Sequence, residues 1–171
     1  MSLKTGLVFL VAVVLSVVGC SKKEKTETAD AKKTQSSSMD QATNQTRNPS
    51  EPDYVVVQHI LIGFDGSIPG KNITRNQEEA EQLADSVFER AKNGEDFDEL
   101  VEQYTDDSAP GIYKMANFGV EANVAQQIYA RAQMVKAFGD VGFSLDVGEI
   151  GMAEYDPQTS RYGWHIIKRI E

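Results

Sequence analysis

Hydrophobic positions divide the chain into three parts of different character. Residues 6–18 are almost wholly apolar, residues 21–52 contain almost no aliphatic side chain larger than alanine, and residues 53–171 alternate between periodic apolar stretches and polar turns. Only the third part carries the periodicities that helices and strands require. We therefore expect a leader at 1–19, a polar segment at 20–52 and one folded domain at 53–171.

Alternation with a period of two predicts a first strand over Tyr54–Phe64. β-Branched residues are dense there, and every second residue from Val55 to Leu61 falls on one face. The Asp-Gly and Pro-Gly pairs that follow indicate a loop. Two further strands are expected near the end of the domain, over Glu149–Tyr155 and Trp164–Ile170, with a polar turn between them.

Two helices are expected directly after the first loop. Apolar residues between 80 and 91 recur at helical spacing, and Thr74 with Gln77 resembles a capping box at the start of this helix. A second, shorter helix is predicted to open at Asp96, with Glu99 three residues later.

A third helical stripe runs through 134–145, although Gly139 and Gly142 weaken it, and residues 112–130 show no clear pattern. Strands are thus separated by a group of helices rather than alternating with them. This order favours an α+β fold, with an antiparallel sheet covered by helices.

The net charge of the predicted domain limits the kinds of partner that it can bind. Residues 53–171 contain 10 Lys and Arg against 21 Asp and Glu, a formal net charge of −11. A domain this acidic does not favour nucleic acid or an anionic membrane face.

The apolar run at 6–18 is shorter than the ~20 residues of a membrane-spanning helix, so it fits an export signal better than a span. It ends in Gly-Cys-Ser, a junction that resembles a bacterial lipobox, and we expect lipidation of Cys20. The alternative is a plain signal peptide with an incidental cysteine. Because Cys20 is the only cysteine of the chain, no intrachain disulfide and no catalytic thiol are expected.

The polar segment that follows Cys20 is too hydrophilic to collapse, which predicts a disordered tether. Its 32 residues at 21–52 would have a root-mean-square span of roughly 30 Å. The first two parts of the chain thus predict a small domain held to a membrane by a lipid, without a protein segment that crosses the bilayer.

The chain has only two histidines, and both lie in strand-like sequence: His59 in YVVVQHILI and His165 in GWHIIKRI. Such residues are either packed and hydrogen-bonded as part of the core or held there for chemistry. A metal site is not expected, because neither histidine belongs to an HxxxH or HExxH pattern.

Four strings in fixed order give the domain a resemblance to the parvulin-type peptidyl-prolyl isomerases, covering nearly all of 54–171. They are QHILI, FDELVEQYTDDSA, QMVKAFGDVGFSLDVGEIG and YGWHIIKR. The resemblance implies a four-stranded antiparallel sheet wrapped by about four helices. It also implies isomerase activity without a cofactor or metal.

The same resemblance assigns the candidate site. It implies a polar catalytic group made of His59, Asp107 and His165. It also implies a pocket for the proline ring and its neighbours, made of Met115, Phe118, Met134, Phe138 and Tyr162.

The chain departs from the family pattern between the acidic turn and the third helix. Gly111-Ile112-Tyr113 stands where the family has two glycines, and about eleven extra residues separate Phe118 from Met134. These departures indicate a reshaped pocket wall.

Two functions fit these observations. One is an isomerase that assists the folding of exported, proline-containing polypeptides; the other is a binding module of the same fold that holds extended chains with little or no turnover. Specificity for phosphorylated substrates is not expected, because the loop after the first strand offers only Lys71 and Arg75. The expected location is the bacterial cell envelope, on the outer membrane facing the periplasm if the cell has one.

Overall fold

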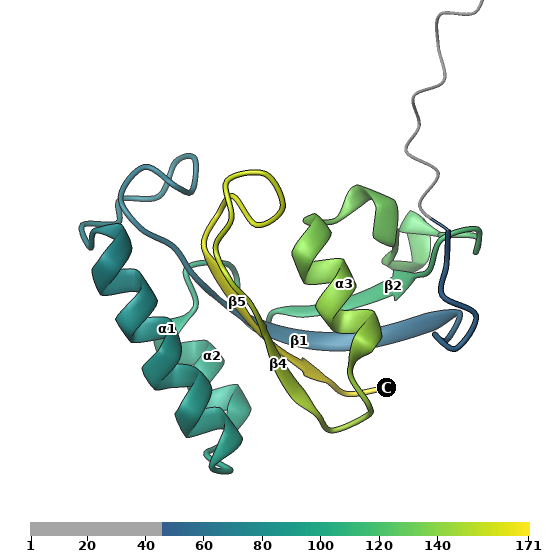
Figure 1. Ribbon diagram of the computed structural model, residues 1–171, viewed down its shortest axis with the longest axis horizontal. Coiled ribbons are helices and arrows are strands. Elements are labelled where there is room, and N and C mark those ends of the chain that lie inside the picture. The colour runs from purple at the N-terminus through teal and green to yellow at the C-terminus, as the bar shows by residue number, and fades with distance from the viewer. Residues whose placement is uncertain (1–45) are drawn as a thin grey trace, which may run out of the picture. The chain divides into compact units, whose positions relative to one another are not determined.

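The computed structural model describes residues 46–171, so the predicted leader, Cys20 and most of the predicted tether lie outside the described residues. Within 46–171, five strands form one sheet in the order β3-β2-β1-β5-β4 (Figure 1). The strands are β1 (Tyr54–Ile62), β2 (Ile112–Ala116), β3 (Ile128–Ala130), β4 (Ile150–Ala153) and β5 (Trp164–Arg169). All neighbours are antiparallel except β2 and β3, which run parallel.

Three α-helices and two short 3₁₀ turns complete the described part of the chain. They are α1 (Gln77–Lys92), α2 (Phe97–Tyr104), η1 (Val124–Gln126), η2 (Arg131–Gln133) and α3 (Lys136–Ser144). In Figure 1, α1 and α2 lie together on one side of β4 and β5, and α3 lies on the other side. None of the helices described is long and apolar enough to cross a lipid bilayer.

The α+β class is confirmed, but the sheet differs from the expected four antiparallel strands by the parallel strand β3. The number of α-helices in residues 46–171 is three, against about four expected. Strands β2 and β3 lie in the stretch 112–130 that showed no clear pattern. At five and three residues, they are too short for alternation to stand out.

The sheet separates two apolar cores. Alternate side chains of β1 point to opposite faces, so this strand contributes residues to both cores. Ile60 and Ile62 pack with α1 and α2, whereas Val55 and Val57 pack with Phe138 of α3. Burying one such aliphatic side chain contributes about 1.5–3 kcal/mol. His59 shares the face of Val57, so β1 directs its imidazole toward α3.

Capping residues fix where the helices begin. The Asn76 side chain accepts a hydrogen bond from the backbone N–H of Glu79 at 2.9 Å, and Glu79 accepts one from the N–H of Asn76 at 2.8 Å. The capping box predicted at Thr74 is therefore wrong by two residues. The predicted cap of α2 is confirmed, because Asp96 accepts from the N–H of Glu99 at 3.1 Å.

Gly142 has a packing role in α3 that its low helix propensity does not reveal. A Cβ at this position would lie 3.0 Å from Cε of Met115 and 3.4 Å from Val57. The small residue thus lets α3 approach the sheet closely, which brings the start of the helix over β1 and β5.

The folded unit begins before residue 53. Glu51 forms an ion pair with the buried Arg131 at 2.6 Å, and the Asn117 amide donates a hydrogen bond to the carbonyl of Pro52 at 2.9 Å. These contacts are polar and without periodicity, which is why the hydrophobic pattern placed the boundary later.

Candidate active site

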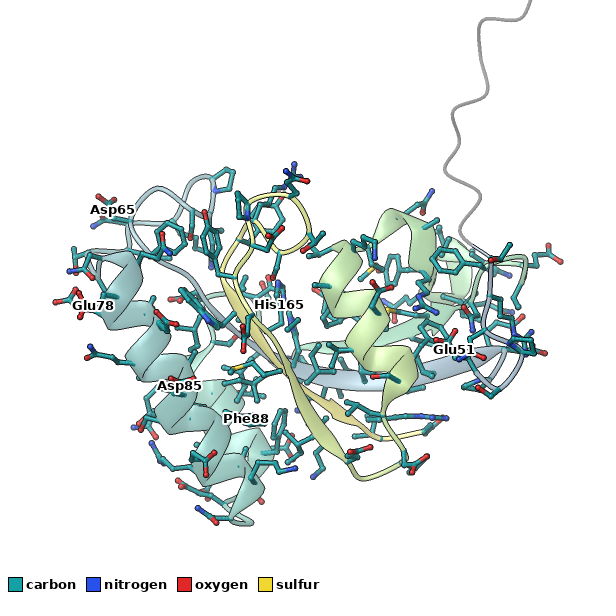
Figure 2. The ribbon with its side chains drawn as sticks, viewed as in Figure 1. Glu51, Asp65, Glu78, Asp85, Phe88 and His165 are labelled. Atoms are coloured by element: carbon teal, nitrogen blue, oxygen red, sulfur yellow. The ribbon has the colours of Figure 1, made fainter. Side chains whose placement is uncertain are left out.

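His59 and His165 face each other across neighbouring strands. In the register of β1 and β5, His165 lies opposite Leu61 and His59 opposite Ile167, so the two imidazoles occupy diagonal positions on one face. Their Nδ1 atoms are 3.2 Å apart and their rings are stacked at 5.4 Å between centroids. Both residues are only 3% exposed. Figure 2 shows His165 in the middle of the fold.

The acidic turn after α2 is held against the end of β1. The backbone N–H of Asp106 donates to the carbonyl of Leu61 at 2.8 Å, and the Asp106 carboxylate accepts from the N–H of Gly63 at 2.8 Å. The hydroxyl oxygen of Thr105 accepts a further hydrogen bond from the backbone N–H of Leu61 at 3.2 Å. This docking carries the next residue, Asp107, to the imidazole of His59.

Asp107 joins the histidine pair to a tyrosine. Its Oδ2 lies 3.1 Å from Nε2 of His59, and it accepts a hydrogen bond from the hydroxyl of Tyr113 at 3.0 Å. The His59 hydrogen bond, with a further contribution from Tyr113, lowers the pKa of Asp107 to about 2. Burial, together with the charge of Asp107, raises the pKa of Tyr113 to about 12. At neutral pH the carboxylate is charged and the phenol is neutral.

These ionisation states orient the hydrogen bonds of the histidines. An ionised Asp107 only accepts, so His59 donates from Nε2 and its Nδ1 accepts from the Nδ1–H of His165. Burial, reinforced by the neighbouring His59, lowers the pKa of His165 to about 3, so this imidazole is neutral. Its Nε2 is buried and has no hydrogen-bond partner within residues 46–171.

A cavity of about 330 Å³ opens beside this polar group. Ligand pockets commonly span about 300–1,000 Å³, so this one suits a small group. Phe138 forms an apolar wall, with its ring centroid 5.0 Å from His59 and 5.4 Å from His165. Its lining residues are His59, Leu61, Ile68, Pro69, Asp107, Tyr113, Met134, Val135, Phe138, Tyr162 and His165.

The cavity brings together six of the eight residues assigned to the polar group and the pocket. These six are His59, Asp107, Met134, Phe138, Tyr162 and His165. They come from β1, the turn after α2, the start of α3, the loop before β5 and β5 itself.

Met115 and Phe118 do not line the cavity, and the structure corrects this part of the assignment. Met115 is 0% exposed and packs in the core beneath α3. Phe118 lies under the Arg131 guanidinium, whose Cζ is 4.6 Å from the ring centroid. In the register of β2 and β1, Met115 lies opposite Val55, farther along the sheet from His59 than Tyr113, which lies opposite Val57.

Tyr113 lines the cavity and contacts Asp107, but it was absent from the sequence assignment. It lies two positions before Met115, and therefore on the same face of β2, but nearer to Asp107. Its ring also contacts His59 edge-on at 5.2 Å between centroids. The signal was present in the sequence: Tyr113 stands in the string that replaces the two family glycines.

The geometry does not suggest a metal centre. Among the residues described, no group of three or more His, Cys, Asp and Glu side chains is arranged to hold a metal ion. The facing Nδ1 atoms of His59 and His165 instead form a hydrogen bond with each other.

Fold and site together define a parvulin-like domain: a mostly antiparallel sheet, a stacked imidazole pair and an apolar cavity under the third helix. The family model of the PPIC-type PPIASE domain matches residues 41–171. The chain therefore belongs to this family of peptidyl-prolyl isomerase domains, and the match begins before residue 53, as the contacts of Glu51 do.

Similar proteins carry this domain within longer chains. The chain is 37% identical over 112 residues to "Chaperone SurA" of Chromohalobacter salexigens, covering 66% of this chain and 21% of the relative. It is 33% identical over 88 residues to "Foldase protein PrsA 3" of Bacillus cereus, covering 52% of this chain and 26% of the relative. The matched part is thus about a quarter or less of the length of these relatives.

A solved structure supports the fold. The solution structure of TbPIN1 matches with a TM-score of 0.51 and 22% sequence identity, covering 70% of this chain and 98% of that chain.

Proposed function

We propose that this domain catalyses the cis–trans isomerisation of peptide bonds that precede proline, in exported polypeptides that are folding in the cell envelope. The observation that carries the proposal is the single cavity that joins an apolar wall of Met134 and Phe138 to the ionised Asp107. Membership of the PPIC-type family and similarity to proteins named as a chaperone and a foldase support it.

The reaction needs a site that stabilises a twisted amide. Rotation about the bond before proline breaks amide conjugation, which sets a barrier of ~18–20 kcal/mol. Neither a nucleophile nor a metal is required by this chemistry. A site that binds the twisted form better than the planar one lowers the barrier.

The apolar wall holds the ring of the substrate proline. The thioether of Met134 adapts to a puckered ring, and Phe138 presents a flat aromatic face. Holding the ring fixes the nitrogen side of the amide, so rotation occurs on the carbonyl side. The same wall excludes water from the bond that turns.

Asp107 and the histidines supply the electrostatic part. Conjugation places partial negative charge on the amide oxygen, and this charge decreases as the bond twists. A carboxylate beside the oxygen therefore disfavours the planar amide more than the twisted one. His59 and Tyr113 position Asp107 through its Oδ2, and His165 fixes the tautomer of His59.

An isomerisation assay with the full chain tests this function. We expect the wild-type protein to accelerate a proline-containing peptide and Met134→Ala to lower kcat/KM by about tenfold, the equivalent of about 1.4 kcal/mol of transition-state binding. Val147→Ala is the matched control, because Val147 is 63% exposed and lies outside the cavity. Peptide binding by the wild-type protein without any acceleration would show a binding module of this fold instead.

We also infer that the chain is exported and held to a membrane by a lipid on Cys20. The support is the apolar run at 6–18, the Gly-Cys-Ser junction and the polar segment after it. Expression in a bacterium with radioactive palmitate tests this. Wild-type protein is expected to incorporate label and Cys20→Ser to lack it; equal labelling of the two would remove the anchor from the proposal.

A further inference from the structure

A second cavity of about 420 Å³ lies beside the proline cavity, at the beginning of β2. One of its walls comes from the extra residues of this chain, which we call the inserted segment (residues 120–130). Gln126, Gln127 and Tyr129 of this segment line the cavity, together with Ile112 and Tyr113.

The inserted segment is held in place by a short parallel pairing. Lys114 lies opposite Ile128 and Met115 opposite Tyr129 in the register of β2 and β3. The pairing of β2 with β3 begins at Lys114, so Ile112 and Tyr113 extend past the beginning of β3 and line the cavity. Tyr129 thereby shares the face of Tyr113, and their ring centroids are 6.1 Å apart.

Tyr113 forms a wall of both cavities. Its ring centroid lies 5.8 Å from that of Phe138 in the first cavity and 6.1 Å from that of Tyr129 in the second. The ring centroids of Phe138 and Tyr129, one on each cavity wall, are therefore at most ~12 Å apart. An extended polypeptide covers that distance in about four residues at ~3.3 Å per residue. One chain can occupy both cavities at once.

The chemistry of the second cavity is that of an apolar pocket with a polar edge. Ile112 is 49% exposed there, and the rings of Tyr113 and Tyr129 add aromatic surface. Lys114 is the one charged side chain among its lining residues, and the two glutamines supply amides that can bond to a peptide backbone. An exposed isoleucine beside two tyrosines is typical of a surface that binds apolar side chains.

We propose that this second cavity binds an apolar or aromatic side chain of the polypeptide whose proline occupies the first cavity, within about four residues of that proline. The inserted segment thus acts as a specificity element. The inference rests on the proposed function, since it deepens the substrate preference of the same site.

Peptides that differ in one residue test this inference on the full chain. Each peptide carries one proline among serines and alanines, with a single phenylalanine placed at one of the four positions before or after it. The wild-type protein is expected to favour phenylalanine at one position over serine by about tenfold in kcat/KM. In Ile112→Ser and Tyr129→Ala, this preference should fall to less than about threefold, measured in each variant as the ratio of kcat/KM for the peptides with and without phenylalanine.

The matched control is Val124→Ser. Val124 is 65% exposed in the same inserted segment but does not line the cavity, so its loss should leave the preference unchanged. Ile112→Ser replaces an exposed side chain, and an unchanged thermal unfolding midpoint confirms that it folds.

The inference is overturned if phenylalanine gains nothing at any position, or if its preference survives in both cavity variants. A wild-type protein that fails to accelerate any peptide contradicts the proposed function instead. In that case, fluorescence anisotropy with the same peptides still decides about the second cavity, because tighter binding of a phenylalanine peptide should depend on Ile112 and Tyr129.

Discussion

At the scale of single residues, the site is a one-way chain of hydrogen bonds that ends on a carboxylate. His165 donates to His59, His59 donates to Asp107, and Tyr113 donates to the same oxygen. The pKa values of Asp107 and Tyr113, about 2 and about 12, keep the carboxylate ionised and the phenol neutral at neutral pH. In the proposed reaction, a substrate amide would therefore lie beside a carboxylate that stays charged at neutral pH.

The neutral state of His165 predicts a pH dependence of stability. Its pKa is lowered to about 3, whereas an unfolded histidine titrates near ~6.5. Between these two pH values, the unfolded chain binds a proton at this histidine that the folded chain does not bind. The free energy of unfolding therefore decreases as pH falls below about 6.5. Asp107, with a pKa of about 2, adds a further loss as pH falls below ~4, since its unfolded pKa is ~3.9.

His165→Asn isolates the histidine part, because the asparagine amide can still donate to His59 but does not titrate. Between pH 7 and pH 4.5, the wild-type free energy of unfolding should decrease by about 1–3 kcal/mol more than that of the variant. Urea unfolding at several pH values measures both slopes. Parallel curves would mean that His165 is not held neutral by the fold.

Replacement of Gly111 should disturb the site directly, because this residue packs against the backbone of His59. Its φ is +67°, and a Cβ there would lie 2.5 Å from the carbonyl oxygen of His59. Gly111→Ala is expected to lower the free energy of unfolding by about 2–4 kcal/mol, because strain and overlap add.

Gly148→Ala separates these two causes. Gly148 has a φ of +88°, but a Cβ there would meet no atom within 4 Å, so only the backbone cost of about 1–2 kcal/mol applies. Chemical denaturation of both variants provides the comparison. Equal losses would show that the approach of Gly111 to β1 is looser than described.

At the scale of elements, periodicity predicted the parts that are long and amphipathic. Strand β1 and helices α1 and α2 carry a repeated apolar pattern, and the pair Asp96 and Glu99 marked a real cap. The capping box of α1 was misplaced because Thr74 and Asn76 are both residue types that cap helices, and the helix begins with Asn76 and Glu79 as the reciprocal pair.

The central stretch resisted prediction for a physical reason. Strand β3 has three residues, and its position depends on pairing with β2 and on Arg131 rather than on its own pattern. The assignment of Met115 assumed the usual course of this stretch. Tyr113 was missed because its role arises from contact with Asp107, which lies in another element.

Arg131 connects elements that are distant in the sequence. Its buried guanidinium binds Glu51 at 2.6 Å, Asn117 at 2.9 Å and Asp140 at 2.9 Å. It also lies between the rings of Phe118 and Phe143, 4.6 and 4.7 Å from their centroids. The entry of the chain, the end of β2 and helix α3 are thus joined through one side chain.

Removing one partner of this group should be costly. Glu51→Ala is expected to lower the free energy of unfolding by about 1–3 kcal/mol, because it leaves a buried cation with fewer acceptors. The control is Asp53→Ala, whose partner Arg47 is paired with it at the surface, where about 0–1 kcal/mol is expected. Thermal and urea unfolding measure both; a smaller effect at Glu51 than at Asp53 would contradict the role of Arg131.

At the scale of the whole molecule, the distribution of charge bears on whether a phosphorylated substrate could bind. The chain has a formal net charge of −9, and Arg75, the arginine of the loop after β1, is already bound to Asp106 at 2.6 and 2.7 Å. Arg161 lies over the ring of Tyr162 at 4.8 Å, but one guanidinium is not the cluster that a phosphate dianion requires.

A phosphoserine before proline should therefore bring no advantage. We expect its kcat/KM to lie within about threefold of that of the unmodified peptide, and to rise rather than fall as salt screens the acidic surface. Parallel assays with both peptides at low and moderate ionic strength are sufficient. A preference of tenfold or more for the phosphorylated peptide, lost at high salt, would contradict this prediction.

The parallel strand β3 has one more consequence, which concerns self-association. A strand with an unpaired side is a template for pairing with other β-chains, which can lead to aggregation. Here β3 covers β2, and Asn123 turns back to exchange two backbone bonds with Ile128, at 3.0 and 2.9 Å. The opposite border, β4, is only four residues long and is flanked by Glu149 and Glu154. Both edges of the sheet thus offer little free strand for pairing with another chain, which disfavours aggregation.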